Sequence, residues 1–266
     1  MNRTASEAVQ TFSSTQWRWR LMRWKRQFKD LLSGRPSSDG LSVTRLLIGT
    51  NILLFIAMVV QGMAAGLGLR PLLNPDTYLL VHSGAQYWPL VIYEGEWWRC
   101  LTYAYTHGGI IHIGFNMLVL YQVGPLIESE LGAARYLVLY TVTALTATGL
   151  GYIWHPMVPV VGASGSLFGL IGFAVTWYHR MGPPGHHIRN FMFRWAAFAF
   201  VFGLLVGADN AGHLGGAIGG ALIGLAMPIG VRARRALAPL FNVLAIICLA
   251  ATVASLGLLV ASWLQA

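Results

Sequence analysis

The chain is divided into seven long apolar segments, and this division restricts its possible folds more than any other feature. We place them at about residues 45–68, 106–125, 134–153, 163–180, 191–208, 211–230 and 238–264. Each is close to the roughly 20 residues that an α-helix needs to cross the hydrocarbon core of a bilayer. A segment in lipid must satisfy its own backbone hydrogen bonds, which favours helices. The sequence therefore predicts an all-α polytopic membrane protein.

The composition agrees with a membrane location. Of 266 residues, 56% are hydrophobic and 10% are charged, whereas soluble domains carry about 25% charged residues. The 31 glycines suit close helix packing in lipid. Cys100 and Cys248 lie in different segments, so we expect no disulfide framework. The N-terminus is long and polar, and does not have the pattern of a cleaved signal peptide.

Three parts follow along the chain: a basic N-terminal segment at 1–44, a core of six spans at 45–230, and a basic loop with the seventh span at 231–266. Between Trp17 and Leu31, apolar residues recur every three or four positions with basic residues between them. This pattern predicts an amphipathic helix, which either lies on an anionic membrane surface or packs on another part of the protein.

The basic residues indicate the orientation of the chain in the membrane. Of the 18 Lys and Arg residues, all except Arg70 and Arg99 fall on the N-terminal side of the predicted spans. Short loops rich in positive charge face the cytoplasm, so we expect the N-terminus inside and the C-terminus outside. The net charge of +9 then faces anionic lipid and does not indicate nucleic acid. With no organelle-type transit peptide, we expect a bacterial inner membrane.

The first outside connection, about residues 69–105, is long and contains eight Tyr and Trp residues from Tyr78 to Tyr105. Such aromatic side chains favour the membrane interface. We interpret the connection as a structured loop in the outer leaflet. It is either a gate or platform for a substrate, or an aromatic anchor with no further role.

Polar side chains inside spans are costly in lipid and need a reason. They gather in three sets, all toward the outside ends of their helices: His107, His112 and Asn116; Ser164 and Ser166; Asp209, Asn210 and His213. The topology therefore puts the three sets at one depth.

These residue types suit acyl transfer. Ser164 would begin the fourth span, where free backbone N–H groups favour negative charge. His213 could take the Ser164 proton and return it to the leaving amine. His112 and Asn116 are four residues apart, share a helix face and could donate to an oxyanion. Asp209 either orients His213 or caps the sixth span.

Glycines repeat every fourth residue after both candidate catalytic residues. Gly165 and Gly169 follow Ser164, and Gly216, Gly220 and Gly224 follow His213. Such faces allow two helices to approach closely. A serine on a face of this kind is alternatively a packing contact. A zinc site built from His107, His112, His213 and Asp209 is a further alternative, but no His-Glu-x-x-His pattern supports it. We expect no metal and no cofactor.

The chain resembles the rhomboid intramembrane serine proteases from about Gly84 to Pro228. The residues that carry the resemblance are Trp98-Arg99, the stretch from His107 through His112 to Asn116, Glu128 with Leu131-Gly132 as a turn after the second span, Gly162-Ala163-Ser164-Gly165, and Gly212-His213-Leu214-Gly215-Gly216 continuing to Gly220.

The resemblance implies a rhomboid-like bundle of six helices, here with one extra C-terminal span, and a Ser–His dyad without a third acid. Ser164 would be the nucleophile and His213 the general base. The oxyanion hole would comprise His112, Asn116 and the Ser164 N–H. Phe168, at a position often occupied by a stacking aromatic, would pack against the imidazole of His213. Arg99 would hold the first loop without taking part in chemistry.

The sequence thus predicts a serine endopeptidase that cleaves membrane-anchored proteins near the outer membrane boundary. The alternatives are a non-catalytic client-binding protein on the same scaffold and a transporter that uses the polar cluster. The sequence carries no signal for an oligomeric state.

Overall fold

The computed structural model describes residues 22, 42–206 and 208–265. Apart from Met22, the amphipathic helix predicted between Trp17 and Leu31 lies outside the described residues. The described chain is built from helices, which confirms the all-α prediction. The long helices are α2 (Val43–Ala64), α7 (Ile110–Leu131), α8 (Ala133–Trp154), α9 (Ser164–Arg180), α10 (His186–Val206), α11 (Asn210–Ala226) and α13 (Ala238–Gln265).

Shorter helical pieces connect them. They are α3 (Arg70–Leu73), α4 (Thr77–His82), α5 (Trp88–Tyr93), α6 (Arg99–Thr102), η1 (Tyr103–Tyr105), η2 (Pro183–Gly185) and α12 (Val231–Ala236). Four of these pieces, α3 to α6, together with η1, form the long loop between the first two long helices. This loop is ordered, as the sequence predicts.

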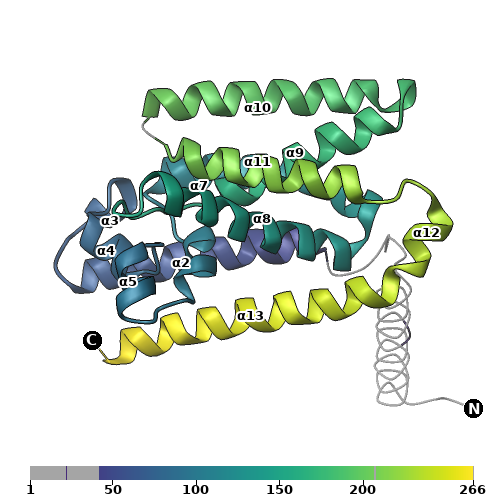
Figure 1. The fold of residues 1–266 in the computed structure, drawn as a ribbon. Helices are drawn as coiled ribbons and strands as arrows, with labels where there is room; N and C mark the ends of the chain where they lie inside the picture. Colours follow the sequence, from purple (N-terminus) through teal and green to yellow (C-terminus); the bar gives the residue numbers. More distant parts are fainter. Residues whose placement is uncertain (1–21, 23–41, 207, 266) are drawn as a thin grey trace, which may run out of the picture.

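The long helices match the seven predicted segments, but they differ in how well they suit contact with lipid. Within the described ranges, four helices are long and apolar enough to cross a membrane: α2, α7, α8 and α13. The helices α9 and α11 have 17 residues each. In Figure 1 they lie between α10 and α13. Most residues of α9 are buried, whereas α11 also has exposed apolar side chains such as Leu214 and Leu222.

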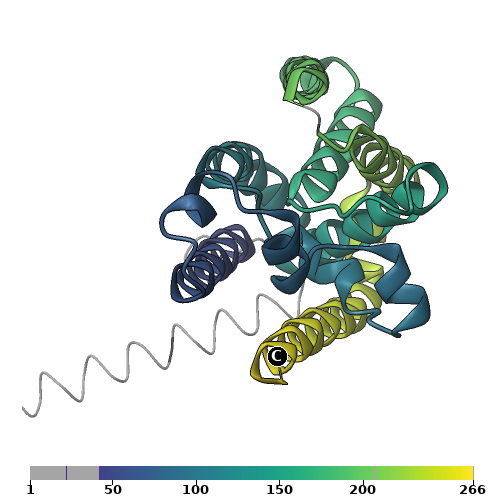
Figure 2. The ribbon, with the colours of Figure 1, turned by 90° about the vertical axis from the view of Figure 1, so that its left-hand side faces the viewer.

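The long helices contact one another in a defined set of pairs. The helices α9 and α11 pack along each other, α8 contacts both, α10 lies against α9, α2 against α7, and α13 against α8. In Figure 2, α10 and α13 lie at opposite edges of the bundle. Large side chains from α8 and α9 fill the centre, where Tyr136, Tyr140, Phe173 and Trp177 are at most 1% exposed.

The end of α7 differs from the prediction. We expect the second span to end near residue 125, yet α7 continues through Pro125 to Leu131. A proline is tolerated inside a membrane helix because neighbouring groups satisfy the backbone that it frees. Glu128 and Leu131 therefore belong to the helix itself, and Gly132, with φ of 80°, makes the turn.

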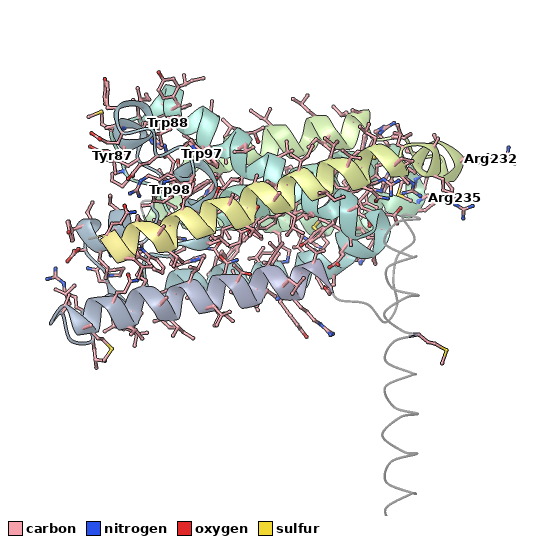
Figure 3. All side chains as sticks on the ribbon, turned by 90° about the horizontal axis from the view of Figure 1, so that it is seen from below. Tyr87, Trp88, Trp97, Trp98, Arg232 and Arg235 are labelled. Atoms are coloured by element: carbon pink, nitrogen blue, oxygen red, sulfur yellow. The ribbon has the colours of Figure 1, made fainter. Side chains whose placement is uncertain are left out.

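The two ends of the bundle carry different side chains. Figure 3 shows Tyr87, Trp88, Trp97 and Trp98 at one end, and Arg232 and Arg235 at the other. One contact of the aromatic loop with the bundle is a short antiparallel pair, in which Gln86 and Val160 exchange backbone hydrogen bonds of 2.9 and 2.8 Å. Val160 lies four residues before Ser164, so this pair connects the loop to the candidate site.

Candidate active site

Ser164 is the first residue of α9, and His213 lies in the second turn of α11. The His213 Nε2 atom is 2.9 Å from the Ser164 Oγ atom, which is hydrogen-bond distance. Ser164 is half-buried and His213 is 5% exposed. The structure therefore brings together, from two helices, a hydroxyl and a ring nitrogen that can accept its proton.

Glycines make this close approach possible. A methyl group placed on Gly216 would lie 1.9 Å from the Gly165 carbonyl oxygen, and one on Gly220 would lie 1.8 Å from the Gly169 carbonyl oxygen. Side chains at these positions would push α9 and α11 apart. The four-residue glycine spacing in the sequence thus corresponds to the backbone contact between the two helices.

The ring of Phe168 lies flat against the imidazole of His213. Their centroids are 4.3 Å apart and the planes differ by 15°. Phe168 is one turn after Ser164, so the helix that carries the hydroxyl also supplies one wall for the imidazole. This stacking restricts the rotation of the His213 ring about its side-chain bonds.

Asp209 does not orient the imidazole in this structure. Its Oδ1 atom accepts from the Gly212 N–H at 2.8 Å, which caps α11, and pairs with His155 Nε2 at 2.7 Å. Among the described residues, the His213 Nδ1 atom is buried and has no hydrogen-bond partner. The arrangement is a pair of serine and histidine, with Asp209 in the capping role.

His112 and Asn116 lie on α7 beside the start of α9. A methyl group on Gly162 would lie 2.7 Å from His112 Nε2 and 3.5 Å from Asn116 Nδ2, and Gly162 has φ of +120°. Position 162 therefore requires glycine on two grounds, its backbone conformation and the approach of His112. The two side chains flank the segment that leads into Ser164.

His112 and Asn116 each have a hydrogen-bond donor near Gly162 that can bind an incoming group. The Gly108 N–H donates to His112 Nδ1 at 3.2 Å, so a neutral His112 carries its proton on Nε2, toward Gly162. Asn116 is 2% exposed, and within the described ranges its Nδ2 atom is buried without a hydrogen-bond partner. A buried donor without a partner is costly and needs an explanation, and at this place an oxyanion would supply the partner.

The N-terminus of α9 supplies further donors. Leu167 N–H makes the first intrahelical bond, to the Ala163 carbonyl. The N–H groups before it lie at the open, positive end of the helix. His112 and Asn116 flank Gly162, two residues before Ser164, so their donors and these N–H groups belong to the same part of the structure.

The remaining residues singled out in the sequence hold the site indirectly. His107 is fully buried, and its ring meets that of His112 edge to face with centroids 5.1 Å apart. Arg99 donates to the carbonyls of Val81 and Ala85 at 2.6 and 3.0 Å, and lies over the Trp98 ring. Burial lowers the pKa of the Arg99 guanidinium, against the opposing influence of its partner Glu96. Arg99 thus fastens the loop.

Glu128 lies at the opposite end of α7 from His112. Its carboxylate accepts from the hydroxyls of Ser42 and Thr44 at 2.8 and 2.7 Å and from the N–H groups of Val43 and Thr44 at 2.6 and 3.0 Å. It therefore caps α2. Among the described residues no three His, Cys, Asp or Glu side chains gather in a way that would hold a metal ion.

Sequence reasoning missed two contacts of the site. His155, at the end of α8, pairs with Asp209, and the Tyr103 carbonyl accepts the N–H of Gly162 at 2.9 Å. Both contacts join residues that are far apart in the chain. No local pattern in the sequence marks either one.

The Rhomboid domain family model matches residues 94–229, just over half of the chain. Rhomboid protease GluP of Bacillus subtilis is 32% identical over 192 residues, which cover 71% of this chain and 34% of that protein. RHOMBOID-like protein 1 of Arabidopsis thaliana is 30% identical over 171 residues, which cover 58% of this chain and 41% of that protein. Rhomboid-like protease 1 of Toxoplasma gondii is 34% identical over 163 residues, which cover 58% of this chain and 54% of that protein.

The chain thus spans about a third to a half of the length of these relatives. The matched region begins within the aromatic loop, ends just after α11, and includes Ser164, His213, His112 and Asn116. The multi-helical membrane fold, the pairing of Ser164 with His213 and the matched family model together identify this chain as a member of the rhomboid family.

Proposed function

We propose that this protein is an intramembrane serine endopeptidase. The observation that carries the proposal is the 2.9 Å contact between Ser164 Oγ and His213 Nε2, from helices in direct backbone contact. A packing role for Ser164 would require neither a ring nitrogen at this distance nor unused donors around it. Relatives that are named as proteases support the same reaction class.

The proposed reaction proceeds in two halves. His213 takes the Ser164 proton as Oγ attacks the carbonyl carbon of the scissile peptide bond, and the resulting oxyanion accepts from the Ser164 N–H, His112 and Asn116. When the intermediate collapses, the imidazolium gives its proton to the leaving amine and an acyl-enzyme remains. His213 then deprotonates water, which attacks the ester and releases the acid product and Ser164. The scheme uses no metal or cofactor.

The proposed substrates are membrane-anchored proteins. Ser164 lies at the end of the bundle that carries the aromatic loop, which we place at the outer boundary of the bilayer, with the N-terminus cytoplasmic and the C-terminus outside. We place the protein in a bacterial inner membrane. A substrate helix must unwind there before its carbonyls can be attacked, so residues that weaken helices, such as Gly and Pro, should favour cleavage.

The test combines two single variants with a serine-directed fluorophosphonate probe. The wild-type protein in detergent should be labelled and should cleave a model transmembrane substrate. Ser164→Ala and His213→Ala should keep the helical circular dichroism spectrum and the melting temperature but lose cleavage and labelling. Cleavage retained by either variant contradicts the mechanism. A folded wild-type protein that is neither labelled nor active would instead favour the non-catalytic client-binding alternative.

A further inference from the structure

The last helix, α13, attaches to the bundle by one narrow face. Its residues Ala245, Thr252, Ser255 and Leu259 are buried and recur at spacings of seven, three and four. The opposite face carries exposed apolar side chains suited to lipid, among them Leu240, Val243, Ile246, Ile247, Leu249, Val253 and Val260. The buried face packs on α8 and α6, so the helix has a fixed rotation against the core.

The C-terminal end of α13 contacts the aromatic loop at two neighbouring points. Trp263 Nε1 donates to the His82 carbonyl at 2.8 Å. Leu259 is 0% exposed, and its Cδ2 atom would lie 3.0 Å from a methyl group on Gly84. Gly84 has φ of +100°, a conformation that glycine adopts readily. These contacts hold the turn at residues 82–84 from the α13 side.

The same stretch of the loop continues directly to the nucleophile segment. Thr102 Oγ1 donates to the Gly84 carbonyl at 2.8 Å. Two residues further on, Gln86 pairs with Val160 through both backbone hydrogen bonds, of 2.9 and 2.8 Å. Val160 is followed by Gly162 and Ser164, so residues 82–86 lie between α13 and the segment that places the hydroxyl.

The N-terminal end of α13 is fastened as well. Arg234, in the short helix before it, pairs with Glu130 at 2.8 Å, and Arg135 donates to the Arg234 carbonyl. The Arg135 guanidinium also lies 5.3 Å from the centre of the Phe241 ring. A helix that is held at both ends and along one face can fix the position of a loop, whereas a simple lipid anchor needs none of these contacts.

We infer that α13 is a brace for the active site, in which Trp263 and Leu259 position residues His82–Gln86 and, through the Gln86–Val160 pair, the segment that ends at Ser164. Trp263 is a positioning residue, since it contacts neither Ser164 nor His213 in the described structure. The inference rests on the proposed function only where cleavage or labelling is the readout.

The first test measures backbone hydrogen exchange and therefore does not depend on activity. In the full chain in lipid nanodiscs, Trp263→Phe keeps an apolar ring but removes the N–H donor, and Leu259→Ala removes the second contact. Both should accelerate exchange of the Gln86 and Val160 amides, by about fivefold for the loss of one hydrogen bond. Leu264→Ala is the matched control, because Leu264 is the next residue and is 84% exposed; it should leave these amides unchanged.

The second test follows the reactivity of Ser164. The rate of fluorophosphonate labelling should fall about fivefold in Trp263→Phe, with the melting temperature close to that of wild type, and should not change in Leu264→Ala.

Unchanged exchange at Gln86 and Val160 in both brace variants overturns the inference. Acceleration spread evenly over all helices also overturns it, since α13 would then be a general stabiliser. If the wild type is not labelled, the proposed function fails, and the exchange experiment still decides the role of α13.

Discussion

Asn116 places a buried amide beside Ser164, and its Nδ2 atom has no hydrogen-bond partner among the described residues. Burying an unsatisfied donor costs about 1–3 kcal/mol of folding stability. The donor is useful if an oxyanion forms next to it during the reaction. Asn116→Ala should therefore lower kcat by about 10²- to 10³-fold, while the melting temperature stays equal or rises. Steady-state cleavage of a transmembrane substrate and thermal unfolding in detergent measure the two effects.

Asn51 provides the matched control for this prediction. It is also fully buried, but its Nδ2 atom donates to the Leu47 carbonyl at 2.7 Å and it lies on α2, away from Ser164. Asn51→Ala should lower the melting temperature and leave kcat of the folded protein unchanged. An Asn116→Ala variant that loses stability and keeps its kcat would remove Asn116 from the oxyanion hole.

Phe168 restricts the imidazole of His213 by ring stacking. Aromatic pairs contribute about 0.5–1.5 kcal/mol beyond the area that they bury. Phe168→Leu keeps an apolar side chain but loses this stacking, so kcat/KM should fall about two- to tenfold. Phe168→Tyr keeps the ring and should stay within about twofold of wild type. Equal rates for Phe168→Leu and wild type would show that the imidazole is oriented by other contacts.

The contact between α9 and α11 sets the distance between the two reacting side chains, Ser164 and His213. Gly216→Ala would put a methyl group 1.9 Å from the Gly165 carbonyl oxygen, so the helices must separate. Overpacking typically costs about 1–3 kcal/mol. The variant should melt at a lower temperature and should also lose cleavage in the fraction that remains folded, because Ser164 and His213 move apart.

Gly257→Ala is the control for that substitution. Gly257 lies inside α13, and a methyl group added to it would have nothing within 4 Å. Alanine also favours helix over glycine by about 1 kcal/mol. The melting temperature of this variant should stay equal or rise, and its cleavage should persist. Full activity in folded Gly216→Ala would mean that the helix contact does not set the distance between the reacting groups.

The elements differ in how well the sequence predicts them. Apolar length predicts the seven long helices, and the four-residue glycine spacing predicts the contact of α9 with α11, because both signals are local. The sequence predicts that the second helix ends too early, near residue 125, whereas α7 runs from Ile110 through Pro125 to Leu131, because a membrane helix can accommodate proline. The contacts His155–Asp209 and Trp263–His82 join distant segments, and no local periodicity encodes such pairs.

The two ends of the helix bundle differ in charge and in aromatic content. Ser164 begins α9 near the aromatic loop, and Arg180 ends it at the other side, where its guanidinium donates to the carbonyls of Gly224 and Met227 at 2.8 and 2.7 Å. Arg232 and Arg235 extend from that same basic end in Figure 3. Positive loops tend to stay in the cytoplasm, so this difference between the two ends supports our proposal that the Ser164–His213 pair faces the outer side.

Fusions on either side of α13 test the orientation. A phosphatase reporter that folds only when its disulfides form outside the cytoplasm should be active when it follows Gln265 and inactive when it follows Arg235, since α13 lies between these residues. A reporter that fluoresces only in the cytoplasm should give the opposite pattern, which controls for expression. The reversed result for both reporters would place the basic end outside and the Ser164–His213 pair toward the cytoplasm. Substrates would then be cleaved near their cytoplasmic boundary.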